Sequence, residues 1–227
     1  LDLRRDPGRI VTVLNDLEAD VIALQEADRR LAPRRAAVPH EMIESDTDYE
    51  IVPVAATAVS LGWHGNALLV RRGIEVLGTE RVPLPGLEPR GAVSARLAAG
   101  GAVFRVVGLH LGLLRGWRRK QLSAVCDHLP GAERARTAIL GDFNEWSPRT
   151  GLEALAREFH TVAPGHSFHS ARPMAALDRV ALGRGFETQG GGVDRKGTAR
   201  IASDHLPVWV DVALSPEAPE APPAPAP

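Results

Sequence analysis

Polar side chains that can bind a metal ion or a phosphate follow several of the short apolar runs in the chain. Gln25 and Glu26 come directly after the run VIAL, and His110 closes the run AVFRVVGLH. A carboxylate at the end of a strand is a hard oxygen ligand that suits Mg²⁺ or Mn²⁺. Taken alone, such an acid is more often solvated, and a single histidine is more often a hydrogen-bonded structural residue. These two positions therefore indicate a functional site only in combination with other polar residues.

The segment AILGDFNEW is more informative, because Asp142 and Asn144 both follow a short apolar strand and a glycine. Spaced two residues apart in an extended turn, they project on the same side of the chain. Asp142 is then placed to hold a water molecule while Asn144 donates to a phosphate oxygen. The alternative is a polar β-turn that contains an aspartate and an asparagine without any chemical role.

Two more polar groups border the last apolar runs. Asp178 and Arg179 stand at the edge of an apolar stretch, where a surface salt bridge is the simpler interpretation. Asp204 and His205 precede the last predicted strand, and adjacent residues of an extended chain point to opposite sides. One of them can therefore face a metal ion while the other faces a substrate.

The elements that must position these side chains alternate between helical and strand patterns. Apolar residues at helical spacing after Asp6 and a proline predict a helix at Pro7–Leu17, and further helices are predicted at residues 116–129 and 148–158. Residues 99–101, Ala-Gly-Gly, are typical of a hairpin turn. Hairpins mixed with crossover helices favour two packed sheets with helices outside. The predicted strands are residues 20–25, 50–54, 66–71, 74–82, 92–97, 102–109, 137–140, 177–182, 186–191 and 206–212.

The composition suits one globular domain. The chain has 227 residues, 44% of them hydrophobic, which is enough for a substantial core. We expect a single domain over residues 1–213 and a disordered Pro/Ala/Glu-rich tail over residues 214–227. The formal net charge is -1, so no overall field draws the molecule onto nucleic acid or an anionic membrane. No apolar run approaches the roughly 20 residues of a membrane span.

In their order along the chain, the polar motifs resemble those of the endonuclease/exonuclease/phosphatase superfamily. This family includes DNase I-like nucleases, abasic-site endonucleases, neutral sphingomyelinases and inositol-phosphate phosphatases. The resemblance implies an α/β fold, a four-layer αββα sandwich of two mixed, largely antiparallel sheets flanked by helices. GDFN and SDH are its most specific parts. The motifs that carry it are QE at 25–26, GNALL at 65–69, PRGA at 89–92, His110, GDFN at 141–144, LDR at 177–179 and SDH at 203–205.

The resemblance also implies a role for each site residue. Asp142 would orient and deprotonate the attacking water, and Asn144 and His110 would hold the phosphoryl oxygens. His205, paired with Asp178, would stabilise the transition state or act as an acid or base. The implied catalytic residues are His110, Asp142, Asn144, Asp178 and His205, the implied phosphate-binding residues are Asn66 and Arg90, and the implied ligands of Mg²⁺ or Mn²⁺ are Glu26 and Asp204.

One departure from the family pattern concerns the start of the chain. The family's first strand carries an asparagine that helps to bind metal, and this strand should precede the helix at Pro7. Because the strand lies inside a sheet, a protein without it would leave unpaired backbone groups in its core. We therefore expect about 10–20 further residues before Leu1 in the natural protein, to complete that sheet.

The substrate is less constrained than the reaction. We expect a phosphate ester, and a small or lipid-headgroup phosphodiester or monoester in preference to long DNA, because the one dense basic stretch, at residues 115–120, is short. That stretch is also consistent with the solvated first turn of a helix. A nuclease acting on DNA or RNA and a non-catalytic binding module on the same fold are the alternatives. We also expect a monomer.

Overall fold

A six-stranded sheet forms the larger layer of the protein. The structure, a computed structural model, describes residues 6–31, 33–147 and 150–215. The neighbouring strands β6 and β7 are parallel and are joined through helix α3 (Arg115–His128), whereas the other neighbours in the sheet are antiparallel. In spatial order the strands are β4 (Glu75–Pro83), β5 (Gly91–Ala99), β6 (Ala102–His110), β7 (Thr137–Asp142), β9 (Asp178–Gly183) and β8 (Phe159–Val162).

The second layer consists of two smaller antiparallel sheets. One has the order β1-β3-β2, and the other pairs β10 with β11. Within the described residues no ladder joins the two pieces, so the second predicted sheet is split between them. An additional upstream strand stays a prediction. The strands are β1 (Val21–Leu24), β2 (Tyr49–Ile51), β3 (Ala67–Arg71), β10 (Phe186–Val193) and β11 (Val208–Leu214).

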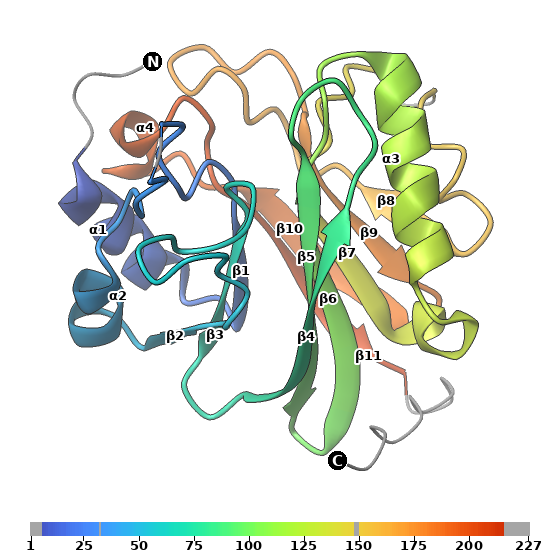
Figure 1. The fold of residues 1–227 in the computed structure, drawn as a ribbon, viewed down its shortest axis with the longest axis horizontal. Helices are drawn as coiled ribbons and strands as arrows, with labels where there is room; N and C mark the ends of the chain where they lie inside the picture. Colours follow the sequence, from blue (N-terminus) through green and yellow to red (C-terminus); the bar gives the residue numbers. More distant parts are fainter. Residues whose placement is uncertain (1–5, 32, 148–149, 216–227) are drawn as a thin grey trace.

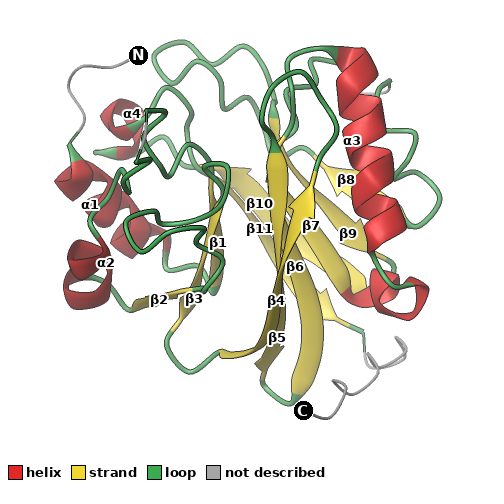
Figure 2. Ribbon diagram, in the orientation of Figure 1, coloured by secondary structure: helices red, strands yellow, loops and turns green. Residues whose placement is uncertain are grey.

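Helices cover the outer faces of the two sheet layers, which gives the predicted order of helix, sheet, sheet and helix (Figure 2). Helix α1 (Pro7–Leu17) begins at the cap residue Asp6 and packs with α2 (His40–Asp46) against β1 and β3. Helix α3 packs its buried Leu122 and Val125 against β6 and β7. The apolar layer between the sheets comes chiefly from β3, β5 and β6. No helix in the described ranges is long and apolar enough to cross a membrane.

Most predicted elements are present, with ends shifted by a few residues. The hairpin turn at Gly100 and Gly101 is confirmed, and both glycines have a positive φ, of 57° and 80°. The predicted helix at residues 148–158 is wrong over its described part, where the chain forms turns closed by bonds such as Leu155 N–H to the Leu152 carbonyl. Gly151, at φ 94°, directs the backbone away from a helix there. Most of the predicted tail lies outside the described residues.

Short elements were missed by the sequence patterns. These are α2, β8, the 3₁₀ turn at Gly131–Arg136 and the single-turn helix α4 (Ala199–Ala202). Each spans at most 7 residues, which is too short to show a helical or strand period. The loops at the ends of β1, β4, β6, β7 and β11 gather at the top of Figure 1, opposite the C-terminus. That end of the molecule carries the predicted site.

Candidate active site

Three strands of the six-stranded sheet place a polar side chain at the same edge. His110 ends β6, Asp142 ends β7 and Asp178 begins β9. The register pairs His110 with Asp142, and Asp142 with Asp178. His110 Nε2 lies 3.3 Å from Asp142 Oδ2. The sheet therefore holds these three predicted residues in one row, which we call the polar row.

The turn after β7 is tighter than the extended turn that the sequence suggested. Asn144 has a left-handed φ of 51°, and its backbone N–H donates to Asp142 Oδ1 at 2.7 Å. The Asn144 side chain donates from Nδ2 to the Leu111 carbonyl at 2.8 Å. An asparagine tolerates this backbone region better than most residues. The turn still brings Asp142 and Asn144 together, and an amide NH₂ has a second N–H that remains for another acceptor.

His205 joins the polar row from the loop before β11. Its Nδ1 lies 2.7 Å from Asp178 Oδ2, and the buried Ser167 hydroxyl donates to the same carboxylate oxygen. The ring also lies 4.9 Å, centroid to centroid, from the ring of Phe168. Because Nδ1 is used by Asp178, the other ring nitrogen, Nε2, is the one left for a substrate.

The charges in the row favour an ionised carboxylate beside a protonated histidine. Burial opposes ionisation of Asp142, but the hydrogen bond and charge of His110, the Asn144 N–H and the charge of His205 outweigh it and lower the Asp142 pKa. Burial likewise opposes protonation of His205. The hydrogen bond and charge of Asp178, with the charges of Asp142 and Asp204, nevertheless raise the His205 pKa to about 9.

The two predicted metal ligands, Glu26 and Asp204, are exposed carboxylates near the row. Glu26 Oε1 accepts from Arg30 at 2.7 Å. That hydrogen bond and the charge of Glu26 raise the pKa of Arg30, to which the charges of Glu88 and Asp204 also contribute. The charges of both predicted ligands therefore act on the Arg30 cation, and carboxylate oxygens are the donors that Mg²⁺ prefers. Among the described residues, no group of three or more His, Cys, Asp or Glu side chains is arranged as a metal site, but the donor chemistry fits.

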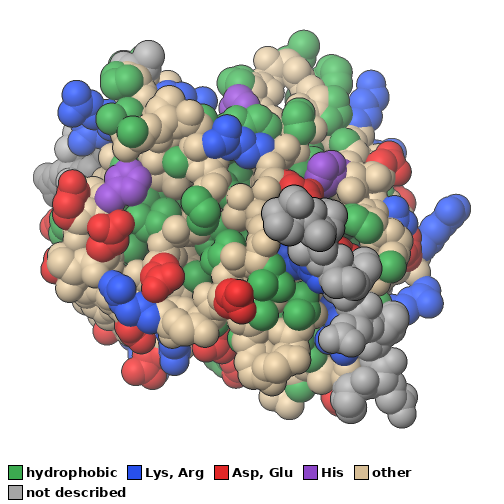
Figure 3. Space-filling view, turned by 60° about the horizontal axis from the view of Figure 1, so that its bottom comes forward, with side chains coloured by type: hydrophobic (Ala, Val, Ile, Leu, Met, Phe, Trp, Pro, Cys, Tyr) green, Lys and Arg blue, Asp and Glu red, His purple; other side chains and the backbone are tan. Residues whose placement is uncertain are grey.

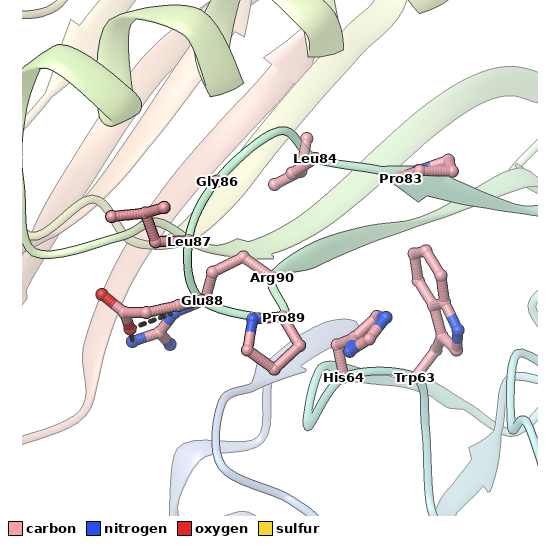
Figure 4. A pocket seen from close by; sticks show the side chains of 9 residues that line it. All are labelled: Trp63, His64, Pro83, Leu84, Gly86, Leu87, Glu88, Pro89 and Arg90. Carbon is pink, nitrogen blue, oxygen red and sulfur yellow. Dashed lines mark hydrogen bonds and ion pairs between the residues drawn. The ribbon is translucent and has the colours of Figure 1, made fainter.

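The two predicted phosphate-binding residues lie in two different loops, Asn66 directly before β3 and Arg90 directly before β5. Arg90 pairs with Glu88 at 2.8 Å and lies opposite Trp63 and His64 across a hollow of about 400 Å³ (Figure 4). Asn66 is buried, and its Nδ2 donates to the Gly91 carbonyl at 2.9 Å, while its Oδ1 is buried without a hydrogen-bond partner. Arg90 therefore lines this hollow, whereas Asn66 is not among its lining residues.

Several residues that shape the site carried no signal in the sequence. Glu145 is buried and accepts from Arg115 and Arg118, each at 2.8 Å. These contacts, with its backbone N–H contact from Ser147, outweigh burial and lower the Glu145 pKa to about 2. Two arginines of the dense basic stretch at residues 115–120 therefore hold the segment after Asn144 in place. Ser167 and Glu88 were also missed, since a lone serine or glutamate in a loop has no distinctive spacing.

A comparison with known sequences identifies relatives along most of the chain. Residues 2–205 match the sequence model of the Endonuclease/Exonuclease/phosphatase family. Uncharacterized protein YbhP of Escherichia coli K12 is 30% identical over 165 residues, which cover 67% of this chain and 64% of that protein. YbhP of Shigella flexneri aligns with the same identity and coverage. The chain thus covers less than two-thirds of the length of these curated relatives.

Solved structures share the fold at lower identity. A functionally unknown conserved protein from Enterococcus faecalis V583 superposes with a TM-score of 0.75 at 16% identity, covering 92% of this chain and 91% of that one. The mannosyl-6-phosphatase Bt3783 of Bacteroides thetaiotaomicron gives 0.71 at 16% identity, covering 92% and 90%. The catalytic domain of human Nocturnin with bound sulfate gives 0.69 at 16% identity, covering 92% and 86%. At such identities the likeness shows the fold alone.

Proposed function

Because the chain belongs to the Endonuclease/Exonuclease/phosphatase family, we propose that it hydrolyses a phosphate ester with the help of a divalent cation. The observation that carries this proposal is the polar row completed by His205. An ionised Asp142 beside His110, and an imidazolium of His205 held by Asp178, lie at one sheet edge. This combination supplies both a base and positively polarised donors, which phosphoryl transfer requires.

Each residue of the row has a distinct task in the proposed reaction. Asp142, ionised through its contacts, accepts a proton from the attacking water. The Nε2–H of His205 donates to a phosphoryl oxygen or to the leaving oxygen, while Asp178 fixes the tautomer of its ring. The free N–H of Asn144 and the ring of His110 hold the remaining phosphoryl oxygens. A divalent cation held by Glu26 and Asp204 would supply further positive charge for the developing charge of the transition state.

A small or lipid-headgroup ester is the substrate that these surroundings favour. A nuclease tracks a phosphate backbone with a cationic groove, but Arg115 and Arg118 of the basic stretch are already paired with Glu145. Figure 3 brings the end opposite the site forward, and on that face acidic and basic side chains are interspersed. The structural neighbour Bt3783, a mannosyl-6-phosphatase, is an example of this fold acting on a small phosphate ester.

The test is a substrate panel with and without EDTA. It contains bis-(p-nitrophenyl) phosphate, sugar phosphates, phospholipids with different headgroups, and supercoiled plasmid. We expect metal-dependent turnover of the small or lipid esters, and a loss of about 10²–10³ in turnover for Asp142→Asn and for His205→Ala. Glu80→Gln, which breaks the exposed His128 pair on the same sheet, is the matched control. Full turnover in either row variant refutes the proposal, and plasmid nicking in preference to the other substrates favours the nuclease.

A further inference from the structure

The loops around the polar row carry exposed apolar side chains that neither the core nor the proposed reaction uses. Most of them are aliphatic, and each lies within five positions of a predicted site residue in the sequence. We call this set the apolar rim. Its members, with their exposed fractions, are Leu31 84%, Leu87 82%, Leu113 66%, Leu114 60%, Trp146 62% and Met174 62%.

Three loops that carry rim residues lie close to one another. The backbone N–H of Leu113 helps to lower the pKa of Glu88, which follows Leu87, so these two loops are neighbours. The charges of Glu88 and Asp204 help to raise the pKa of Arg30, which precedes Leu31. These loops are among those gathered at the top of Figure 1.

The other side of the rim is joined through the loop that leads to Asp178. Met174 donates its N–H to the Phe168 carbonyl at 2.7 Å, and the Phe168 ring lies 6.4 Å from that of Trp146. Trp146 and Met174 border a hollow of about 220 Å³. Phe168 in turn contacts the ring of His205. Met174 and Trp146 are therefore linked through Phe168 to His205.

The charges interleaved with the rim are positive. Within the described part of the chain, the exposed side chains of Arg29, Arg35 and Arg172 make no ion pair. The acidic side chains beside the rim are mostly neutralised, since Glu26, Glu88 and Glu145 each accept from an arginine. The rim thus has a local positive excess although the whole chain has a net charge of -1.

We propose that the apolar rim docks the site end of the protein onto an anionic phospholipid surface. Exposed leucines and a tryptophan enter the boundary between headgroups and acyl chains, where burial of apolar area is favourable. The arginines stay at the level of the anionic headgroups. Docking would hold the polar row at the depth of the headgroup phosphates. The purpose of the docking rests on the proposed function, whereas the docking surface itself does not depend on the reaction.

A lipid surface fits this set better than a nucleic acid does. Single-stranded nucleic acid is held by aromatic rings on which bases stack, whereas five of the six rim residues are aliphatic or thioether side chains without a π-face. A second copy of the chain would bring the unpaired arginines of one rim against those of the other, which is repulsive.

Vesicle co-sedimentation tests the docking directly. The Asp142→Asn protein in EDTA is mixed with vesicles of phosphatidylcholine alone, or of phosphatidylcholine and phosphatidylglycerol in equal parts. We expect at least about tenfold stronger partitioning to the anionic vesicles, reduced by roughly 0.5 M NaCl. The double variant Leu113→Ser/Leu114→Ser and the variant Arg172→Glu should each lower partitioning by about tenfold or more.

Matched controls lie away from the rim. Val212→Ser changes an exposed valine of β11, and Arg157→Glu reverses an exposed arginine before β8. Neither should change partitioning. Equal partitioning to both vesicles, rim variants that bind as the parent does, or a dimer in light scattering that excludes vesicles would each overturn the docking. Vesicle binding without turnover of any panel substrate would refute the proposed function alone. Turnover of soluble esters without vesicle binding would refute the docking alone.

Discussion

The pair formed by His205 and Asp178 gives the sharpest quantitative prediction. The His205 pKa is raised from its ordinary 6.5 to about 9, a difference of about 2.5, which corresponds to about 3 kcal/mol in favour of the imidazolium. Asp178→Asn keeps the shape and an acceptor oxygen but removes the charge. We expect the His205 pKa to fall by about 2 in this variant, because burial then meets less opposition.

The same shift sets a dependence of stability on pH. A raised folded-state pKa contributes stability that is fully present below the unfolded value of about 6.5 and is lost as pH rises through the folded value. The metal-free protein should therefore lose up to about 3 kcal/mol of unfolding free energy from this pair between pH 6.5 and about 9. In Asp178→Asn most of that dependence should disappear.

The measurement is an NMR titration of the histidine ring protons, with urea unfolding at several pH values. Both are done in EDTA, because a cation at the neighbouring Asp204 would itself repel a proton from His205. Glu80→Gln is the matched control, since it removes the carboxylate of another histidine pair, with Nε2 of His128 at 2.6 Å. Glu80 also pairs with the buried Arg105 at 3.3 Å, so the control is read on the His205 pKa, which it should leave unchanged. A His205 that titrates near 6.5 in the wild-type protein, or one unmoved by Asp178→Asn, would refute the reasoning.

Three further substitutions test how the site is held together. Glu145→Gln should lower the free energy of unfolding by about 3 kcal/mol above pH 4.5, because the Glu145 pKa is lowered from 4.5 to about 2. In the wild-type protein that contribution is lost as pH falls from 4.5 toward 2, which acid unfolding measures. Gly141→Ala should cost more than about 1 kcal/mol in thermal unfolding, since a Cβ at its φ of 141° would lie 2.0 Å from the Leu109 carbonyl oxygen; unchanged stability would contradict this register. Ser167→Ala should lower kcat more than it raises KM, because it loosens Asp178; an unchanged pH profile would argue against such a positioning role.

The polar row was predictable because each of its members stands at the end of an apolar strand. Strand ends are fixed by the sheet, so His110 and Asp142 meet once β6 and β7 are parallel neighbours. The remaining site residues were predicted from the order of the motifs along the chain. The roles assigned to these residues stay predictions, whereas the fold that brings them together is confirmed.

The residues that sequence reasoning missed act through loops. Arg30 reaches Glu26, Glu88 approaches His110, and Ser167 holds Asp178 across 11 positions of the sequence. None of these contacts follows from a period or a spacing, because loop geometry depends on what each loop meets in three dimensions. The same holds for residues 150–158, where a glycine and short turns prevail over helical spacing.

The two proposals place chemistry and recognition in different parts of the chain. The polar row lies on β6, β7 and β9, whose backbones are fixed by continuous ladders. The apolar rim and the unpaired arginines lie on loops that connect the strands, and these tolerate change without disturbing the ladders. Substitutions in the rim should therefore alter which surface or ester is presented while leaving hydrolysis of a small soluble ester intact. Substitutions in the row should remove hydrolysis of soluble and of membrane-bound esters alike while leaving vesicle binding intact, because no loop contact can replace a base and a donor held in register by the sheet.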